Sequence, residues 1–230
     1  MQSLTNRLNS TSELVAAVKH IDEACAVTRL NMANVQTVGY KRIVPVFENN
    51  AQLFFRRSFS QGELTRTEGE LDVAINGPGF FEVQMPDGTH AYTRNGAFRV
   101  AADGRICTSH GYPVSSWQPK ATGTTTVTIS HEGLVTYFSP RGTASFNLHL
   151  VRFPAVDQLA LNSDGLFVET VGSGVAAHGS PGQDGFGELL QGYLELANVH
   201  VVEERVRLIV FESWKREVLK AIEAKTEGKR

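Results

Sequence analysis

Both ends of the chain carry apolar or small residues at the spacing of an amphipathic helix, and this pattern constrains the fold most strongly. Between residues 11 and 35 the intervals alternate between four and three, which marks the seam of a heptad repeat. The seam consists of Leu14, Val18, Ile21, Cys25, Thr28, Met32 and Val35. Thr11 or Ser12 is placed to cap the start of this helix, because a hydroxyl there can accept a hydrogen bond from an amide of the first turn.

A second helical stripe runs from about residue 199 to residue 224, and Glu203 and Glu204 near its start suit the positive end of the helix dipole. Its apolar members are Val202, Val206, Ile209 or Val210, Trp214, Val218 and Ile222. An amphipathic helix in water has to bury its stripe, and the simplest partner for each helix is the other. The two chain ends are therefore expected to lie side by side as a coiled coil. The expected contacts bring Val18 or Ile21 of the first helix close to Val206 or Val210 of the second.

The residues between the helices have the pattern of antiparallel β structure. Most of the 21 glycines lie between residues 39 and 192, and four tight turns are indicated by an acidic residue followed by glycine. These turns are Asp87-Gly88, Asp103-Gly104, Glu132-Gly133 and Asp164-Gly165. Residues 80–85, 125–129 and 144–150 are predicted to be strands, whereas the glycine-rich residues 172–187 are predicted to be an irregular surface segment.

The predicted fold class is α+β, with an antiparallel β-rich central domain inserted between N- and C-terminal α-helices that pair as a coiled coil. The predicted parts are an N-terminal helix in residues 1–42, a β-rich domain in residues 43–190 and a C-terminal helix in residues 191–230. A hydrophobic content of 41% with 20% charged residues is typical of a folded chain.

The sequence does not have the pattern of a protein that binds nucleic acids or spans a membrane. There are 22 Lys and Arg against 24 Asp and Glu, so no excess of basic residues is present to neutralise phosphates. Arg56 and Arg57 lie among aromatic residues between positions 53 and 59, where an exposed or inter-subunit strand edge is an equally good explanation. The longest strongly apolar run, Leu208 to Phe211, is far shorter than the roughly 20 residues that span a bilayer. The first residues also lack the pattern of a secretory signal peptide.

No residues with the pattern of an active site, cofactor site or metal site emerge. The stretch from Gly77 to Glu82 begins like a dinucleotide fingerprint, but it ends in Glu and precedes a predicted strand instead of a helix. A tight turn that lets Phe80 and Phe81 enter the β core explains it better. The seven histidines lack the short spacings of zinc ligands, and the two cysteines are expected to be small buried hydrophobic residues. The sequence therefore predicts no catalytic residue, no cofactor and no bound metal.

Three motifs follow one another along the chain and can be compared with a known set of signatures. The first contains Asn31, Asn34, Gly39 and Lys41, within Asn-Met-Ala-Asn-Val-Gln-Thr-Val-Gly-Tyr-Lys. The second contains Asp72, Gly77, Gly79, Phe80, Phe81, Tyr92, Thr93, Arg94 and Gly96. The third contains Gln191, Gly192, Leu194, Glu195, Asn198 and Val199. Together they resemble the N-terminal, central and C-terminal signatures of the rod and hook family, the axial proteins of the bacterial flagellum.

The resemblance implies a structural subunit of the basal-body rod, most like the distal rod protein, that polymerises into a helical drive shaft. A proximal rod or hook subunit is the first alternative, and a stand-alone β-rich binding module is the second. The implied partners are copies of the chain itself, other rod and hook subunits, the surrounding ring proteins and the flagellar export apparatus. The implied location is the periplasmic rod, reached through type III export without a cleaved signal peptide. The residues expected to support assembly are Leu14, Val18, Ile21, Cys25, Met32, Val35, Val202, Val206, Ile209 and Val210.

Overall fold

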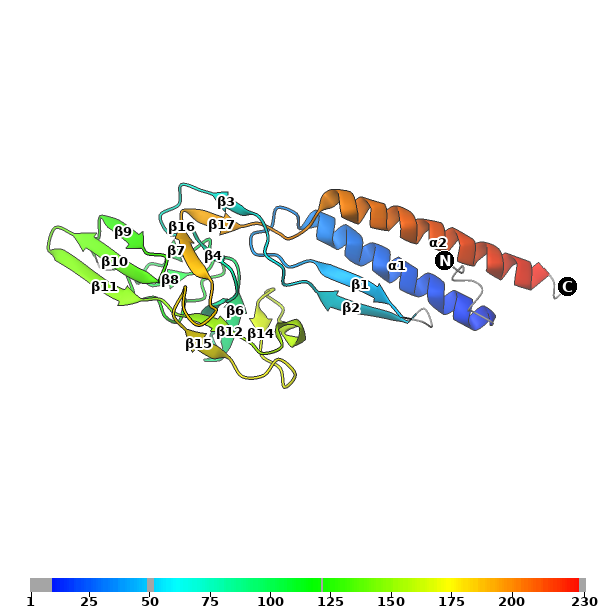
Figure 1. Cartoon of the computed structure of the whole chain (residues 1–230), viewed down its shortest axis with the longest axis horizontal. Helices are drawn as coiled ribbons and strands as arrows, with labels where there is room; N and C mark the ends of the chain where they lie inside the picture. The colour runs from blue at the N-terminus through cyan, green and yellow to red at the C-terminus, as the bar shows by residue number, and fades with distance from the viewer. Residues whose placement is uncertain (1–9, 49–51, 121, 228–230) are drawn as a thin grey trace. The chain divides into compact units, whose positions relative to one another are not determined.

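The computed structural model describes residues 10–48, 52–120 and 122–227. The chain divides into two compact units. A helical unit comprises the described parts of residues 1–36, 41–58 and 198–230, and a β unit comprises residues 37–40 and 59–197. Figure 1 labels the elements of both units.

The helical unit contains two long helices and one hairpin. Helix α1 spans Thr11–Ala33 and α2 spans Val201–Glu227, while β1 (Ile43–Phe47) and β2 (Leu53–Arg57) form an antiparallel pair. The N-cap of α1 is Ser10, so the expectation of Thr11 or Ser12 is wrong by one or two positions. The Ser10 hydroxyl accepts from the Glu13 amide, and the Glu13 carboxylate accepts from the Ser10 amide, which satisfies two donors at once.

Helices α1 and α2 lie in contact, as expected from their apolar stripes (Figure 1). The seam predicted for α1 is largely confirmed, because Leu14, Ile21, Cys25 and Thr28 are buried. The face predicted for α2 is partly wrong. Its buried apolar residues are Phe211 and Val218, joined by the partly buried Leu208, Trp214 and Ile222, whereas Val206 is 55% exposed and Ile209 65% exposed. Residues beyond Phe211 thus follow the predicted stripe, and the first two turns of α2 do not.

The hairpin of β1 and β2 belongs to the helical unit, so the predicted boundary at residue 43 is also corrected. Phe47 makes edge contacts with Phe211 and Trp214 of α2, with ring centroids 5.7 Å and 5.8 Å apart. Such aromatic pairs add to the apolar area that the helices bury. Phe54 and Phe55 on β2 are 43% and 47% exposed. The hairpin therefore completes the core of the helical unit on one side and exposes aromatic residues on the other strand.

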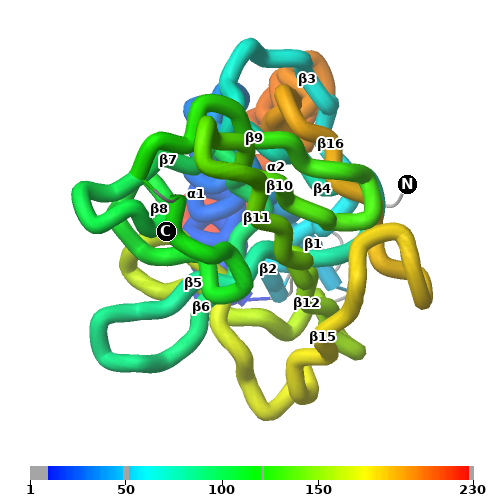
Figure 2. The backbone as a smooth tube through the Cα atoms, turned by 90° about the vertical axis from the view of Figure 1, so that its left-hand side faces the viewer, coloured from blue at the N-terminus to red at the C-terminus, as the bar shows by residue number. Residues whose placement is uncertain are grey.

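The β unit is built from short antiparallel strands, as predicted. They are β3 (Leu64–Arg66), β4 (Val73–Asn76), β5 (Phe81–Gln84), β6 (His90–Thr93), β7 (Arg99–Val100), β8 (Ile106–Cys107), β9 (Thr126–Ile129), β10 (Leu134–Ser139), β11 (Gly142–Asn147), β12 (Leu150–Arg152), β13 (Ala160–Leu161), β14 (Phe167–Val168), β15 (Ala177–Gly179), β16 (Glu188–Gln191) and β17 (Tyr193–Glu195), with a 3-10 turn at Val156–Gln158. A four-stranded sheet has the order β13-β14-β6-β5. A three-stranded sheet has the order β11-β10-β9, and its strands are labelled in Figure 2. The remaining strands pair as β12-β15, β16-β4, β17-β3 and β7-β8.

The turn predictions are confirmed, and the predicted irregular segment is partly wrong. Gly88, Gly104, Gly133 and Gly165 all adopt positive φ at the four predicted turns. Within residues 172–187, however, Ala177–Gly179 form β15, which pairs with β12. A short strand flanked by glycines gives little periodic signal, because only three residues make the pairing.

The Gly77-Pro78-Gly79 turn feeds two aromatic residues into two clusters of the β unit. Gly77 has φ +115° and Gly79 φ +138°, a conformation that side chains with a Cβ rarely adopt. Phe80 packs with Tyr92, Val151 and Phe167. Phe81 belongs instead to the larger cluster that contains Val83 and Trp117. Both aromatic residues are therefore buried, on opposite sides of the chain, because neighbouring residues of an extended segment point in opposite directions.

We expect Phe81→Ala to lower the free energy of unfolding of the β unit by about 3 to 5 kcal/mol, through lost apolar transfer and the cavity left behind. Phe81 is 1% exposed and lies 5.0 Å from the Phe98 ring, which contacts Trp117. Denaturation followed by Trp117 fluorescence in a Trp214→Phe background measures the loss, because Trp214 belongs to the helical unit. The matched control is Phe138→Ala on β10, which is 39% exposed. A loss below about 1 kcal/mol for Phe81→Ala would show that the motif is not a core element.

Candidate functional site

Residues of all three sequence motifs meet at one buried ion pair in the β unit. Arg94 is 4% exposed, and its Nε lies 2.7 Å from the carboxylate of Glu195, which is 1% exposed. The guanidinium also donates to the carbonyl oxygens of Ile75, Gly77 and Gly79, at 2.6 to 2.8 Å. Arg94 and the glycine turn that it holds both belong to the central motif. Burial lowers the pKa of the Arg94 guanidinium, and the Glu195 carboxylate opposes that change.

Glu195 connects this arginine to the N-terminal motif. Its backbone carbonyl accepts from the Gly39 amide at 2.8 Å, and its carboxylate accepts from the Gly62 amide at 2.8 Å. Gly39 has φ +71°, and a Cβ at this position would lie 2.6 Å from the backbone nitrogen of Asn95. Only glycine fits that approach without displacing the backbone. The Arg94–Glu195 pair therefore fastens segments that lie more than 100 residues apart in the sequence.

Other central motif residues stabilise the same turns. The Asp72 carboxylate accepts from the Thr67 hydroxyl at 2.7 Å, and the Thr93 hydroxyl accepts from the Asn95 amide at 2.9 Å. A Cβ on Gly96 would overlap the carbonyl oxygen of Val73. Each of these motif residues has a packing or hydrogen-bonding role in the fold, which explains its residue type without any chemistry.

Gln191 and Gly192 anchor the return of the chain from the β unit. The Gln191 amide nitrogen donates to the carbonyls of Glu70 and Val127, and its oxygen accepts from the Ile129 amide, all at 2.9 Å. Gly192 adopts φ +73°. Leu194 lies next to Glu195 on β17, half-buried, and pairs with Thr65 of β3.

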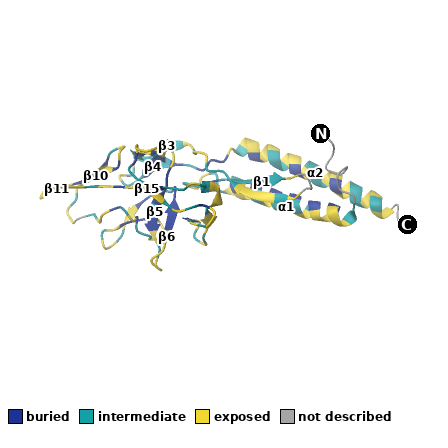
Figure 3. Cartoon of the chain, turned by 60° about the horizontal axis from the view of Figure 1, so that its bottom comes forward, coloured by how far each residue is buried: buried dark blue, intermediate teal, exposed yellow. Residues whose placement is uncertain are grey.

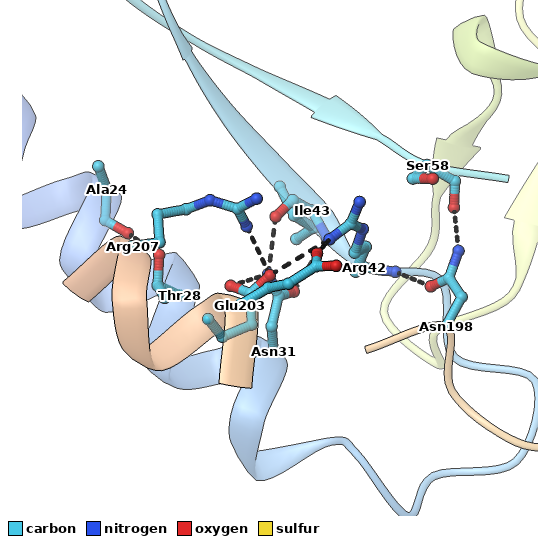
Figure 4. Close-up of polar contacts among 10 residues, drawn as sticks. Ala24, Thr28, Asn31, Arg42, Ile43, Ser58, Asn198, Glu203 and Arg207 are labelled. Carbon is cyan, nitrogen blue, oxygen red and sulfur yellow. Dashed lines mark hydrogen bonds and ion pairs between the residues drawn. The ribbon is translucent and has the colours of Figure 1, made fainter. Parts of the chain in front are cut away.

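In the helical unit, a second polar cluster connects the C-terminal end of α1 with the N-terminal end of α2 (Figure 4). Glu204 of α2 is fully buried, and its carboxylate accepts from Asn31 at 3.2 Å and from Arg207 at 2.5 Å. Arg42 lies 3.6 Å from the same carboxylate and 3.2 Å from Glu203. Two guanidinium groups and an amide thus compensate one buried negative charge, as such a charge requires.

Asn31 also fixes the start of the hairpin. Its amide nitrogen donates to the Ile43 carbonyl at 2.7 Å, and its oxygen accepts from the Ile43 amide at 2.9 Å. Asn198 acts in the same way on the other side, since its oxygen accepts from the Arg42 amide and its nitrogen donates to the Ser58 carbonyl. Asn31 and Asn198 come from the N-terminal and C-terminal motifs, so these motifs are the anchors that bring α1, α2 and the hairpin together.

The remaining N-terminal and C-terminal motif residues lie around this cluster. Lys41 is 2% exposed and offers its carbonyl to Arg57 at 2.6 Å. Asn34 caps the end of α1, where its side chain donates to the Leu30 carbonyl. Val199 is 7% exposed just before α2.

The residues expected to support assembly divide into two groups. Leu14, Ile21 and Cys25 are buried between the helices, and Val18, Met32 and Val35 are partly buried. Val202, Val206, Ile209 and Val210 instead form an exposed apolar face at the start of α2. Figure 3 shows exposed segments of α2 in yellow. Three residues of this face, Val202, Val206 and Val210, also line a shallow groove between α2 and β1, together with Phe47 and Trp214. The first group holds the helices together, and the second presents apolar surface to solvent.

Several residues that hold the helical unit were not predicted from the sequence. Phe211 is a core residue, the partly buried Leu208 packs against the same cluster, and Arg42 and Glu204 belong to the polar cluster. The apolar character of Phe211 was a signal that could have revealed it. No local signal could have paired Arg42 with Glu204, because the two lie far apart in the sequence.

Cys25 and Cys107 are buried, as predicted, and burial raises the pKa of both thiols. Within the part of the chain that the structure describes, no three His, Cys, Asp or Glu side chains are grouped so that they could hold a metal ion. Among the same residues, neither helix is long and apolar enough to cross a membrane.

Comparisons with known proteins identify the family. The family model described as flagellar hook protein FlgE/F/G D1 domain matches residues 74–137, which include the glycine turn and Arg94. The flagellar basal-body rod protein FlgG of Buchnera aphidicola subsp. Schizaphis graminum is 34% identical over 210 residues, covering 78% of this chain and 81% of the relative. The chain belongs to the flagellar basal-body rod protein family. The FlgG of Borreliella burgdorferi is likewise 34% identical, over 213 residues that cover 78% of this chain and 80% of the relative.

A relative with a different name in the same family is also similar to this rod protein. The flagellar basal-body rod protein FlgF of Caulobacter vibrioides is 30% identical over 203 residues, covering 78% of each chain. The resemblance to axial proteins seen in the sequence is confirmed, and so is the likeness to FlgG, the distal rod protein. The chain is a structural subunit of the flagellar rod.

The family motif residue Tyr92 is expected to make the free energy of unfolding of this rod protein depend on pH. Burial, with the nearby Glu169 and Glu82 carboxylates, raises the pKa of Tyr92 to about 12, whereas a tyrosine in an unfolded chain titrates near about 10. Between these values the unfolded chain has lost a proton that the folded chain keeps. The stability contribution is therefore complete below pH about 10 and is lost as the pH rises toward about 12.

Between pH about 10 and about 12, we expect the free energy of unfolding to fall less steeply with pH in Tyr92→Phe than in the unaltered protein. Chemical denaturation at a series of pH values between about 9 and about 12 measures the slope for both proteins. Tyr193→Phe is the control, because Tyr193 is a partly buried tyrosine on β17 that does not belong to the cluster around Tyr92. Equal slopes for Tyr92→Phe and the unaltered protein would contradict the assignment.

Proposed function

We propose that this rod protein polymerises through its helical unit. In this proposal α1 and α2 pair as a coiled coil and form the inner layer of the helical tube, while the β unit packs outside them and sets the register between subunits. The buried residues of the α1 seam hold the two helices together. The exposed residues Val202, Val206, Ile209 and Val210 contact neighbouring subunits.

The apolar face at the start of α2 carries this proposal. Val202 is 76% exposed and Ile209 is 65% exposed, although α2 buries other apolar residues against α1. A contiguous apolar surface on a soluble protein marks a place where another molecule binds.

The names of the relatives place them in the flagellar basal body, and we propose the same location for this chain, in the periplasmic rod. The proposed partners are copies of this chain, other rod and hook subunits, the surrounding ring proteins and the export apparatus. Export without a cleaved signal peptide belongs to the same proposal. The role is purely structural and uses no catalytic residue, cofactor or metal. A proximal rod subunit is the second candidate, and the similarity to FlgF favours it over a hook subunit.

A complementation experiment tests the proposal. The chain is expressed in a flagellated bacterium that lacks its own distal rod subunit, and swimming is measured together with the number of completed rods. Val206→Asp is expected to abolish both, because a carboxylate in the apolar face has to be desolvated at the subunit contact. The matched control is Val171→Asp, which places the same charge at a fully exposed valine of the β unit.

Both variants are first checked for folding by circular dichroism. Restored swimming with the unaltered chain and with Val171→Asp, but not with Val206→Asp, is the expected result. Swimming restored equally by Val206→Asp would contradict assembly through the α2 face.

A further inference from the structure

Two of the apolar surfaces of the helical unit share no residue with each other. The α2 ridge consists of Val202, Val206 and Ile209, which are spaced by four and three residues and are all more than half exposed. The α1–α2 groove is a depression between the two helices, lined by Val15, Val18, Ala26, Leu219 and Ile222. One copy can therefore offer its ridge to one neighbour while its groove receives the ridge of another.

The dimensions of the two surfaces match. With a rise of about 1.5 Å per residue, the ridge from Val202 to Ile209 extends over about 10 Å, and the groove extends over about 16 Å along α1 from Val15 to Ala26. A row of side chains at intervals of three and four is the pattern that packs into the groove between rows of another helix. The ridge is thus short enough to lie entirely within the groove.

The charges beside the two surfaces include opposite ones, because the Glu203 carboxylate beside the ridge is paired with Arg42 and Arg205 is exposed there. Lys19, Asp22 and Glu23 line the α1 side of the groove, so carboxylates outnumber the ammonium group there. Asp22 has a close partner in Lys215 at 2.6 Å, whereas the contact between Glu23 and Lys19 is long, 3.9 Å, and exposed. On the ridge, exposed Arg205 lies three residues after Val202 and four before Ile209, on the same side of the helix.

We propose that the α2 ridge of one copy docks into the α1–α2 groove of a second copy, with Arg205 facing Glu23. This inference rests on the proposed polymerisation and names the surfaces that carry it. The contact is heterologous, since ridge and groove are different parts of the subunit. A heterologous contact that does not close into a ring continues from copy to copy as a helical filament.

Cysteine cross-linking tests the pairing. Val206→Cys marks the ridge and Leu219→Cys marks the groove, and the two proteins carry different tags. They are mixed at concentrations where sedimentation shows that the full chain assembles, and then oxidised. The two positions are 13 residues apart on one helix, about 20 Å, so a disulfide between them has to join two copies. The unaltered chain, in which Cys25 and Cys107 are buried, is the blank.

The expected product is a mixed dimer that contains both tags, with at least about tenfold less dimer when either variant is oxidised alone. Equal cross-linking of Val206→Cys with itself would show a ridge-to-ridge contact and overturn the inference. Sedimenting polymer without the mixed dimer would overturn the inference too, while leaving polymerisation intact. A full chain that never sediments would overturn the proposed function, and this inference with it.

A charge exchange tests the position of Arg205. Glu23→Arg and Arg205→Glu are each expected to raise the concentration needed for assembly by about fivefold, because each places like charges opposite one another. The double variant restores the attraction and is expected to assemble within about twofold of the unaltered chain. If the double variant assembles no better than the worse single variant, Arg205 does not face Glu23.

Discussion

Deleting the chain from Glu203 onward is expected to abolish polymerisation and leave the β unit folded. The deletion removes Glu204, Phe211 and Val218, the buried residues through which α2 packs in the helical unit. Helix α1 would then lose the surface that buries its seam, and an isolated amphipathic helix of 23 residues gains little stability alone. Every core residue of the two β-unit clusters lies before the deletion.

Sedimentation measures the loss of polymer, and circular dichroism measures the loss of helix. Both helices are expected to disappear from the spectrum, although only α2 is deleted. The thermal transition of the β unit, followed by Trp117 fluorescence, is expected to remain. The control is a shorter truncation that ends at Ala224 and keeps all three buried residues. Polymer formed equally well by the long truncation would contradict assembly through the helical unit.

Replacing Arg94 by Ala is expected to lower the unfolding free energy of the β unit by at least about 3 to 5 kcal/mol. Removing one partner of a buried ion pair leaves the other charge uncompensated, and here the Glu195 carboxylate would remain buried. The carbonyl groups of Ile75, Gly77 and Gly79 would lose a donor in addition. The expected loss therefore exceeds that of an ordinary core substitution.

Denaturation in a Trp214→Phe background measures this loss, because Trp117 is then the tryptophan that reports on the β unit. The control is Arg105→Ala, which breaks an exposed ion pair with Asp103 at 2.6 Å and is expected to cost less than about 1 kcal/mol. A similar small effect for Arg94→Ala would show that the three motifs do not depend on this arginine.

The sequence predicts the helices of this protein better than their contacts. The α1 seam is correct at Leu14, Ile21 and Cys25, because polar residues separate the apolar positions and leave one possible face. At the start of α2, Val201, Val202 and Val206 are followed, after Arg207, by the apolar run from Leu208 to Phe211. Apolar residues there lie on several sides of the helix, so periodicity alone cannot choose the buried face. The choice depends on where Phe47 of the hairpin packs.

In the candidate site, too, the sequence predicts the local features but not the contacts between distant segments. The motifs identify Arg94, Glu195 and Gly39 as residues of interest, and the glycine turns follow from local conformational rules. Their meeting around one ion pair depends on contacts between segments separated by more than 100 residues. The Asn31 and Glu204 contact is of the same kind, and so no window of sequence contains it.

A density map of the assembled full-length chain by electron cryo-microscopy tests the central claim most directly. The account predicts a helical tube in which α1 and α2 are paired and the α2 ridge of each subunit contacts the next subunit. The β unit should lie farther from the tube axis than the helices. A closed ring, or a tube in which Val202, Val206 and Ile209 remain exposed while the β units make all the contacts, would contradict it.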